Sequence, residues 1–187
     1  MQTLVVSTAL KPASKTLAAA RAVRAHLERA GAAVDLADLA EEPLPQCDGS
    51  ACYRDEGVQA MTRRVLAAQL VVLCFPVYNY QPNAAAKNFI ELTNDGWKDK
   101  VVSLVANTGG ERSYLAPLPL ANSLMVDHRC LIVPRFIYLP PAAYNAEGSV
   151  VLEGSIGALF ESQMQASCHL ARAWTTLHEL VDVSTVK

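Results

Sequence analysis

The chain has 187 residues, of which 51% are hydrophobic and 18% charged, and its formal net charge is −2. This composition excludes an intrinsically disordered chain, and the nearly balanced charge argues against nucleic acid and anionic membrane surfaces as partners. The length suits one domain covering residues 1–187 with a buried core of its own.

Two further features bear on where the protein works. No segment reaches the ~18 apolar residues that a transmembrane helix needs, and the start, MQTLVVSTAL, lacks the basic region of a signal peptide. The cysteines are odd in number and scattered, as is typical of free thiols in a reducing compartment. They are Cys47, Cys52, Cys74, Cys130 and Cys168. The sequence predicts a cytoplasmic protein without membrane association.

Short apolar runs alternate with helical patterns along the whole chain. The runs predict strands at residues 3–8, 32–39, 70–75, 100–107 and 130–134. The 3.6-residue patterns predict helices at residues 14–30, 57–68, 83–93, 114–127 and about 154–181. Strands that are apolar on both faces indicate a parallel sheet covered by helices on both sides. With right-handed crossovers, this pattern predicts a five-stranded, doubly wound α/β sandwich.

In such sheets, ligands bind outside the carboxyl ends of the strands, so the loops after the first, third and fourth strands are the candidate site. The first loop, STALKPASKT, places hydroxyl groups and lysines at a helix start, where free N–H groups and the helix dipole favour a phosphate. It matches neither G-x-x-x-x-G-K-[ST] nor G-x-G-x-x-G, which favours a monophosphate over a triphosphate or a dinucleotide. The alternative is that Ser14 only caps the helix and that the lysines are solvated.

The other two loops have features that suit a flat ligand. PVYNYQPN, at residues 76–83, combines tyrosines and asparagine with prolines that stiffen the backbone, so a heteroaromatic ring could lie along it. Its tyrosines could equally be packing residues. The paired glycines of Asn107-Thr108-Gly109-Gly110 allow close approach of a ligand to the backbone, or form an ordinary turn. The meeting of all three loops at one sheet edge favours a binding site.

Together, these loops resemble the NADPH-dependent FMN reductase family. The resemblance covers most of residues 3–140 and is carried by Pro76-Val77-Tyr78-Asn79, by Lys87-Asn88 at the family's spacing, and by Asn107-Thr108-Gly109-Gly110. It implies a flavodoxin-like three-layer sandwich with strand order 2-1-3-4-5 and helices on both faces. It also implies FMN as cofactor, with NADPH or NADH as the reductant.

The resemblance also implies which residues bind the cofactor. The first loop would hold the FMN phosphate, the second would line the ribityl chain and the isoalloxazine, and the third would contact the pyrimidine end. The expected cofactor-binding residues are Thr8, Lys11, Ser14, Lys15, Thr16, Pro76, Val77, Tyr78, Asn79, Tyr80, Asn107, Thr108, Gly109, Gly110 and Ser113. The chain departs from the family pattern at Ser7, Lys11 and Val77, where the family usually has glycine, arginine and glutamate. These departures point to a preferred acceptor other than free FMN.

The implied function is that of an NAD(P)H-dependent, FMN-containing oxidoreductase that passes hydride to FMN, a quinone or another small acceptor. We expect no catalytic acid or base from the protein, because the cofactor carries the chemistry. The alternatives are a flavodoxin-like electron carrier for a protein partner and a flavin-free scaffold. The mild charge and the Pro-x-Tyr-Asn motif favour the enzyme. The apolar helices at 83–93 and 114–127 predict a homodimer or homotetramer.

The remaining chemistry-bearing residues form no recognised motif. The four histidines lack metal-ligand spacing, so we expect no metal site and assign them to packing or to the surface. Cys47 and Cys52, in QCDGSAC, lack the spacing of a C-x-x-C redox pair or a zinc knuckle. A redox-active pair there is a minor alternative.

Overall fold

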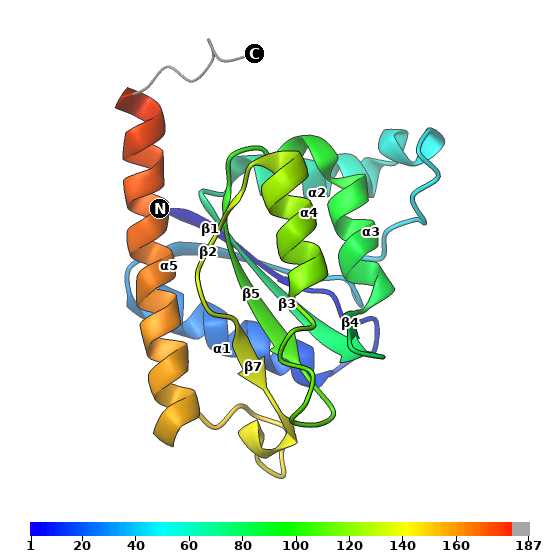
Figure 1. Cartoon of the computed structure of the whole chain (residues 1–187). Coiled ribbons are helices and arrows are strands. Elements are labelled where there is room, and N and C mark those ends of the chain that lie inside the picture. Colours follow the sequence, from blue (N-terminus) through cyan, green and yellow to red (C-terminus); the bar gives the residue numbers. More distant parts are fainter. Residues whose placement is uncertain (181–187) are drawn as a thin grey trace.

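The protein is an α/β sandwich, seen in a computed structural model that describes residues 1–180 (Figure 1). The strands are β1 Gln2–Ser7, β2 Ala33–Asp38, β3 Leu70–Tyr78, β4 Gln81–Pro82, β5 Val101–Asn107, β6 Leu131–Ile132 and β7 Ile137–Leu139. The α-helices are α1 Lys15–Arg29, α2 Glu56–Ala67, α3 Ala84–Leu92, α4 Leu118–His128 and α5 Gly154–Leu180. Short 3₁₀ helices are η1 Ala51–Arg54, η2 Asn94–Gly96 and η3 Pro141–Ala143. The predicted end of the last helix, residue 181, lies outside the described residues.

The central strands form one parallel sheet in the order β2-β1-β3-β5-β6. This path matches the predicted order 2-1-3-4-5 and confirms a flavodoxin-like fold, but the sheet has seven strands and not the predicted five. Two short strands were not predicted: β4 pairs antiparallel with the end of β3, and β7 pairs parallel with the end of β5.

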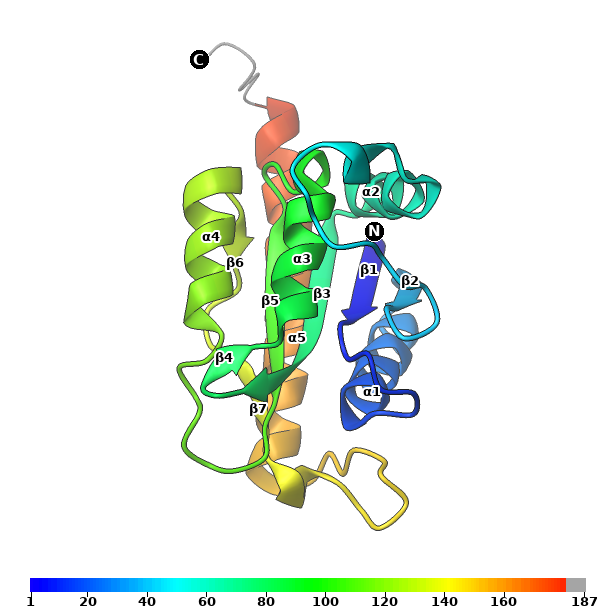
Figure 2. The same ribbon diagram turned by 90° about the vertical axis from the view of Figure 1, so that its right-hand side faces the viewer.

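Alternation along each strand divides the core into two layers. In β1, Leu4 and Val6 face the cluster that contains Phe89 and Leu124, from α3 and α4. Val5, between them, belongs to the opposite cluster, formed with α1 and α5. Figures 1 and 2 show the same division, with α1 and α5 on one face of the sheet and α2, α3 and α4 on the other. Both faces of the central strands are therefore buried, as predicted.

Two predicted boundaries were wrong. The helix expected at 114–127 begins only at Leu118, with Pro117 as its N-cap. A proline disfavours helical geometry in the residue before it, here Ala116, which favours a helix start at this point. The strand expected at 130–134 ends already at Ile132, as β6, because Pro134 lacks the N–H that a ladder needs and Arg135 has a left-handed φ of 65°.

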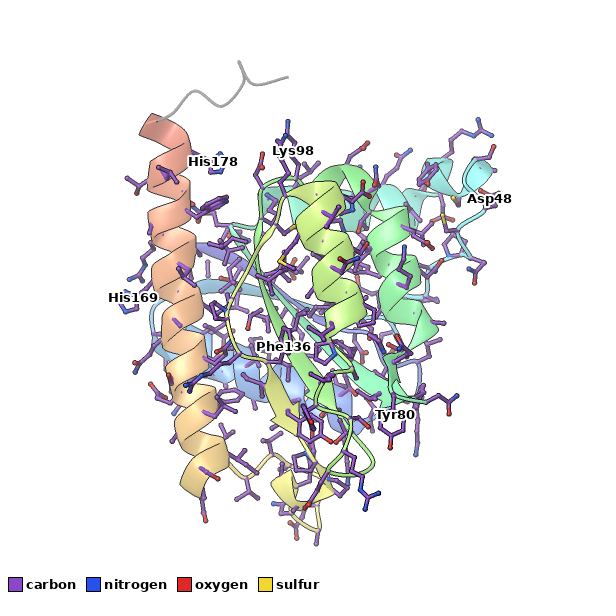
Figure 3. The ribbon with its side chains drawn as sticks, in the orientation of Figure 1. Asp48, Tyr80, Lys98, Phe136, His169 and His178 are labelled. Carbon is purple, nitrogen blue, oxygen red and sulfur yellow. The ribbon has the colours of Figure 1, made fainter. Side chains whose placement is uncertain are left out.

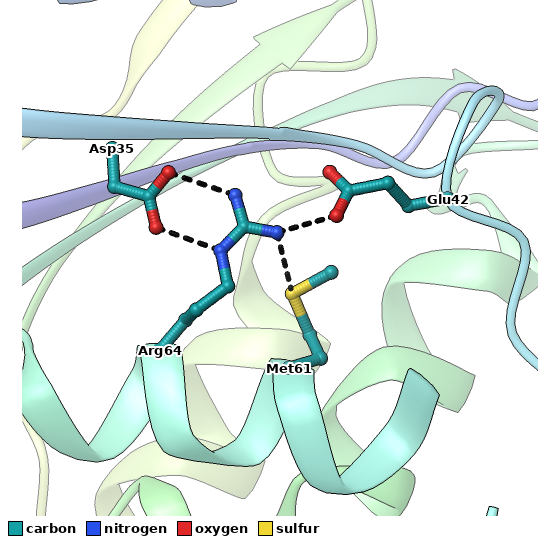
Figure 4. Close-up of polar contacts among 4 residues, drawn as sticks. All are labelled: Asp35, Glu42, Met61 and Arg64. Carbon is teal, nitrogen blue, oxygen red and sulfur yellow. Dashed lines mark hydrogen bonds and ion pairs between the residues drawn. The ribbon is translucent and has the colours of Figure 1, made fainter. Parts of the chain in front are cut away.

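Hydrogen bonds and ion pairs of Arg64 connect α2 to the edge strand β2 (Figure 4). Arg64 Nε and Nη2 donate to the two carboxylate oxygens of Asp35 at 2.7 and 2.9 Å. Its Nη1 donates to Glu42 Oε2 at 2.6 Å and lies 3.7 Å from the sulfur of Met61. The two acids raise the pKa of Arg64 above its ordinary value, and the hydrogen bonds with Asp35 are the largest cause. This fork-shaped pairing holds the edge strand in register with the helix.

Within the part of the chain that the structure describes, no helix has both the length and the apolar stretch needed to cross a membrane.

Candidate functional site

The carboxyl ends of β1, β3 and β5 are neighbours at one edge of the sheet. Ser7 pairs in register with Cys74, and Pro76 pairs with Asn107. The loops that follow these strands therefore begin side by side, as predicted. Figure 1 shows the ends of β3, β5 and β7 together at the lower edge of the molecule.

The first loop is tied to the start of α3 by two buried hydrogen bonds. Thr8 Oγ1 donates to Asn83 Oδ1 at 2.8 Å, and Asn83 Nδ2 donates to the Thr8 carbonyl at 2.7 Å. Thr8 is fully buried, so its hydroxyl serves the fold and does not face a ligand. Asn83 was not among the predicted residues, because its partner lies 75 positions away in the sequence.

The start of α1 has the features of an anion site. Ser14 caps the helix by accepting the Leu17 N–H at 3.1 Å, and the hydroxyl proton of Ser14 remains available to a ligand. The first turn contains no acidic residue, and Lys11 and Lys15 are exposed beside it. The Thr16 side chain is buried at 2% exposure, so at this position the backbone N–H is the better phosphate donor.

The second loop is a tight β-hairpin. Tyr78 pairs with Gln81, and the two residues between them, Asn79 and Tyr80, both have left-handed φ values, 51° and 62°. This is the pattern of a type I′ turn, in which asparagine is common and tyrosine is not. Tyr78 and Tyr80 are each 61% exposed. The tyrosines thus project from the sheet edge and do not pack in the core, which removes the alternative interpretation of this loop.

The third loop is anchored by tyrosines that follow it in the sequence. Thr108 Oγ1 donates to the Gly110 carbonyl at 2.7 Å, and the hydroxyl of Tyr138 hydrogen-bonds the same carbonyl. The Tyr138 oxygen also accepts the Ser113 N–H at 3.1 Å. These contacts hold the loop in place while Gly109 and Gly110 remain exposed.

Tyr144 joins the first and third loops. Its hydroxyl hydrogen-bonds Asn107 Oδ1 and lies 3.2 Å from the Lys15 carbonyl, while the Lys15 ammonium lies 5.0 Å from its ring centroid. Burial raises the pKa of Tyr144 far above its ordinary value, so the hydroxyl keeps the proton that it donates. Tyr144 was missed in the sequence because it lies in an irregular loop 37 positions from Asn107.

A cavity of about 440 Å³ opens between the second and third loops. Six of the predicted residues line it, namely Val77, Asn79, Tyr80, Gly109, Gly110 and Ser113, together with Glu111 and Arg112. The first-loop residues Lys11, Ser14 and Lys15 are not part of its wall, and neither is Tyr78. The candidate site therefore has two parts, a ring-sized cavity and a separate anion site at the start of α1.

The sheet order and the placement of these loops define a protein with the flavodoxin-like fold. A family model described as NADPH-dependent FMN reductase matches residues 1–143. The chain therefore belongs to the NADPH-dependent FMN reductase family, an oxidoreductase family. This confirms the resemblance predicted from the sequence, with FMN and NADPH as the cofactors of the family.

Individual relatives agree with this family. The FMN-dependent NADPH-azoreductase of Staphylococcus aureus is 32% identical over 166 residues, which cover 83% of this chain and 86% of the relative. The enzyme of the same description from Staphylococcus saprophyticus is 31% identical over 117 residues, or 59% of this chain, and the match spans 62% of that relative's length. The flavoenzyme NAD(P)H:(acceptor) oxidoreductase of Paracoccus denitrificans superposes with a TM-score of 0.75 at 20% identity, covering 92% of this chain and 97% of the other. At this level of sequence identity, the similarity shows a shared fold.

The residues present fit a flavin. A Cβ added at Gly109 or Gly110 would meet no atom within 4 Å, so the space in front of both glycines is open to a ring. Among the described residues, four buried side-chain polar atoms lack hydrogen-bond partners, and two of them, Ser7 Oγ and Asn107 Nδ2, lie at the ends of β1 and β5 beside the site. Unpaired polar atoms of this kind are unusual in a protein core and suit an edge that binds a polar ligand.

Proposed function

We propose that the chain is an NAD(P)H-dependent oxidoreductase that binds FMN at this edge of the sheet and reduces a small acceptor. The observation that carries the proposal is the open cavity between the Asn79-Tyr80 hairpin and Gly109-Gly110, with an anion site nearby at the start of α1. Its volume of about 440 Å³ falls in the range of ordinary cofactor pockets.

Bound FMN supplies the hydride transfer, and the protein supplies position and electrostatics. The N-terminus of α1, with Ser14 and Lys15, would hold the phosphate through backbone N–H groups, a hydroxyl and a positive charge. Backbone N–H groups at Gly109 and Gly110 would face the pyrimidine edge, where negative charge develops on reduction. The Tyr80 hairpin would form a side wall of the ring. No protein acid or base is required.

We infer that the acceptor is a small, flat aromatic molecule such as an azo compound or a quinone. Azoreductase is the name of both Staphylococcus relatives, which supports the azo class as the first probe. Arg112 and Glu111 are among the residues that line the cavity, so an acceptor there meets one charge of each sign.

The test is anaerobic titration of the FMN-loaded protein with NADPH and then with an azo dye. Bleaching of the flavin absorbance, followed by its return with loss of the dye colour, is the expected result. Flavin that binds but stays oxidised with NADPH and NADH would instead identify an electron carrier. A protein that binds no flavin would refute the site assignment.

We also propose that residues 1–187 form a single FMN-binding domain and that the protein is cytoplasmic, where NADPH is available.

We propose in addition that the chain forms a homodimer or homotetramer. Support for the oligomer comes from α4 and the turn before it, where apolar side chains are exposed. They are Tyr114, Leu115, Leu118, Met125 and Val126, at 62, 59, 47, 48 and 76% exposure.

A further inference from the structure

Two cysteines lie close together in the segment between β2 and α2. The sulfur atoms of Cys47 and Cys52 are 4.0 Å apart. Cys47 is half-buried, whereas Cys52 is buried at 6% exposure. The sequence spacing matched no redox motif, and the proximity results from the 3₁₀ turn η1, which folds Cys52 back toward Cys47.

Hydrogen bonds hold both cysteines in this arrangement. Asn88 Oδ1 accepts the Cys47 N–H at 2.8 Å, and Asn88 Nδ2 donates to the Pro45 carbonyl at 2.9 Å. Asp48 Oδ1 accepts the N–H of Ser50 at 2.8 Å and that of Cys52 at 3.1 Å. Interactions with the Cys52 side chain, then with the N–H groups of Cys52 and Ser50, lower the pKa of Asp48 to about 2. The Asp48 side chain is therefore ionised at neutral pH, and its carboxylate accepts the hydrogen bonds that shape this turn.

The sulfur of Cys47 contacts the hydroxyl of a tyrosine. The hydroxyl of Tyr53 lies 3.7 Å from Cys47 Sγ, and this contact raises the pKa of Tyr53, so the phenol remains protonated and can donate to the sulfur. The remaining three cysteines lie in the protein core. Burial raises the pKa of Cys74, Cys130 and Cys168, and each is packed in one of the two main core clusters. Such thiols are inert.

We propose that Cys47 and Cys52 form a thiol modification site that a hydroperoxide oxidises reversibly to a disulfide. The sulfur of Cys47 attacks a peroxide oxygen, the O–O bond breaks, and a sulfenic acid and one molecule of water form from hydrogen peroxide. The sulfur of Cys52 then attacks Cys47 Sγ, the S–O bond breaks, and the hydroxyl leaves with the Cys52 proton as a second water. Two thiols lose two electrons and two protons, and the peroxide gains them.

The geometry allows this closure with small movements. A disulfide bond is ~2.05 Å long, so the sulfur atoms must approach by ~2 Å, which side-chain rotation within one turn can supply. Asp48, between the two cysteines, lies far from Tyr80 of the flavin cavity in Figure 3. We therefore expect the disulfide to form without loss of FMN, and its formation does not depend on the proposed reductase activity.

The experiment uses the FMN-loaded protein, reduced, desalted and treated with a small excess of hydrogen peroxide. After denaturation and alkylation, trypsin releases residues 30–54 as one peptide that ends at Arg54 and contains both cysteines. The expected peptide carries no alkyl groups and is lighter than the reduced form by two hydrogen atoms. Dithiothreitol before alkylation should restore two alkylated cysteines. Two alkylated cysteines after peroxide, or a bond from either cysteine to another peptide, would overturn the proposal.

Single substitutions distinguish the sulfur that attacks the peroxide, Cys47, from the sulfur that closes the disulfide, Cys52. In Cys52→Ser, we expect the sulfenic acid on Cys47 to persist and to react with dimedone, whereas Cys47→Ser should show neither adduct nor disulfide. Cys168→Ser is the matched control and should retain the disulfide. Flavin absorbance of each variant reports that it is folded. Absence of a dimedone adduct on Cys47 in Cys52→Ser would contradict the assignment of Cys47 as the attacking sulfur.

Discussion

At the scale of single residues, Gly109 and Gly110 differ from the other glycines of the chain. Gly31, Gly49 and Gly148 have left-handed φ values that favour glycine, whereas Gly109 and Gly110 do not. Added Cβ atoms at the latter two would meet nothing within 4 Å. The folded chain therefore does not need glycine at either position, and the bare backbone there supports the proposed close approach of a ligand.

This leads to a prediction for Gly110→Val. The branched side chain would occupy the cavity, so the Kd for FMN should rise at least about tenfold, or ~1.4 kcal/mol. The free energy of unfolding of the flavin-free protein should change by less than ~0.5 kcal/mol, because the added atoms meet open space. Flavin fluorescence titration and urea denaturation measure the two quantities. Equal FMN affinity in the variant would place the ring elsewhere.

A second residue-scale prediction concerns Tyr144→Phe. The substitution removes the hydroxyl that contacts Asn107 and the Lys15 carbonyl but keeps the ring beneath the Lys15 ammonium. We expect weaker FMN binding, by about 1 kcal/mol, because the anion site and the third loop are no longer joined.

Riboflavin, which lacks the phosphate, distinguishes this effect from general damage. Its affinity should fall less than that of FMN in Tyr144→Phe. Tyr53→Phe, at an exposed tyrosine away from the cavity, is the matched control and should leave both affinities unchanged. Equal losses for the two flavins would show that Tyr144 does not act through the phosphate end.

At the scale of elements, the sequence was most informative where a pattern repeats. Apolar runs at residues 3–8 and 70–75 predicted the strands within a few residues, and Ser14 and Gly31 predicted the limits of α1. The prediction failed at α4 and the fifth strand, where Pro117, Pro134 and the left-handed Arg135 override the apolar pattern. The hairpin at Asn79-Tyr80 was missed because type I′ turns usually contain glycine.

In the candidate site, the residues placed by sheet topology were predicted, and those placed by long-range hydrogen bonds were missed. The loops after β1, β3 and β5 follow from topology alone, and six predicted residues line the cavity. Asn83 and Tyr144 were missed because their hydrogen bonds join positions 75 and 37 residues apart, which local spacing cannot indicate.

The docking of α2 on β2 gives a prediction for Arg64→Lys. An ammonium cannot reproduce the two parallel hydrogen bonds to Asp35 together with the bond to Glu42. We expect the free energy of unfolding to fall by about 1 kcal/mol, measured by urea denaturation. Arg63→Lys, at the exposed neighbouring position, is the control and should have little effect. An unchanged midpoint in Arg64→Lys would mean that the fork contributes no net stability.

At the scale of the whole molecule, the outer side of α4 is the surface best suited to a partner subunit. Leu118, Met125 and Val126 share this side at helical spacing, and Val126 is 76% exposed. Isolated exposed apolar residues are ordinary, but a group on one helix is typical of an interface between subunits.

The corresponding prediction is that Val126→Glu converts the oligomer to a monomer, because burial of an unpaired carboxylate would be required in the interface. Light scattering after size exclusion gives the mass directly. Leu177→Glu, on α5 and 48% exposed, is the control and should retain the wild-type mass. A wild-type chain of 20.1 kDa in solution would refute the oligomer itself.

The Asn79-Tyr80 hairpin affects how this chain would respond to selection for thermal stability. A tyrosine at φ 62° is strained, and Asn-Gly is the sequence that such a turn prefers. Selection for thermal stability alone should therefore favour Tyr80→Gly, whereas selection for turnover should retain the phenol as a wall of the cavity. The two selections would act on the same position in opposite directions, which makes position 80 a place where stability and activity trade against each other.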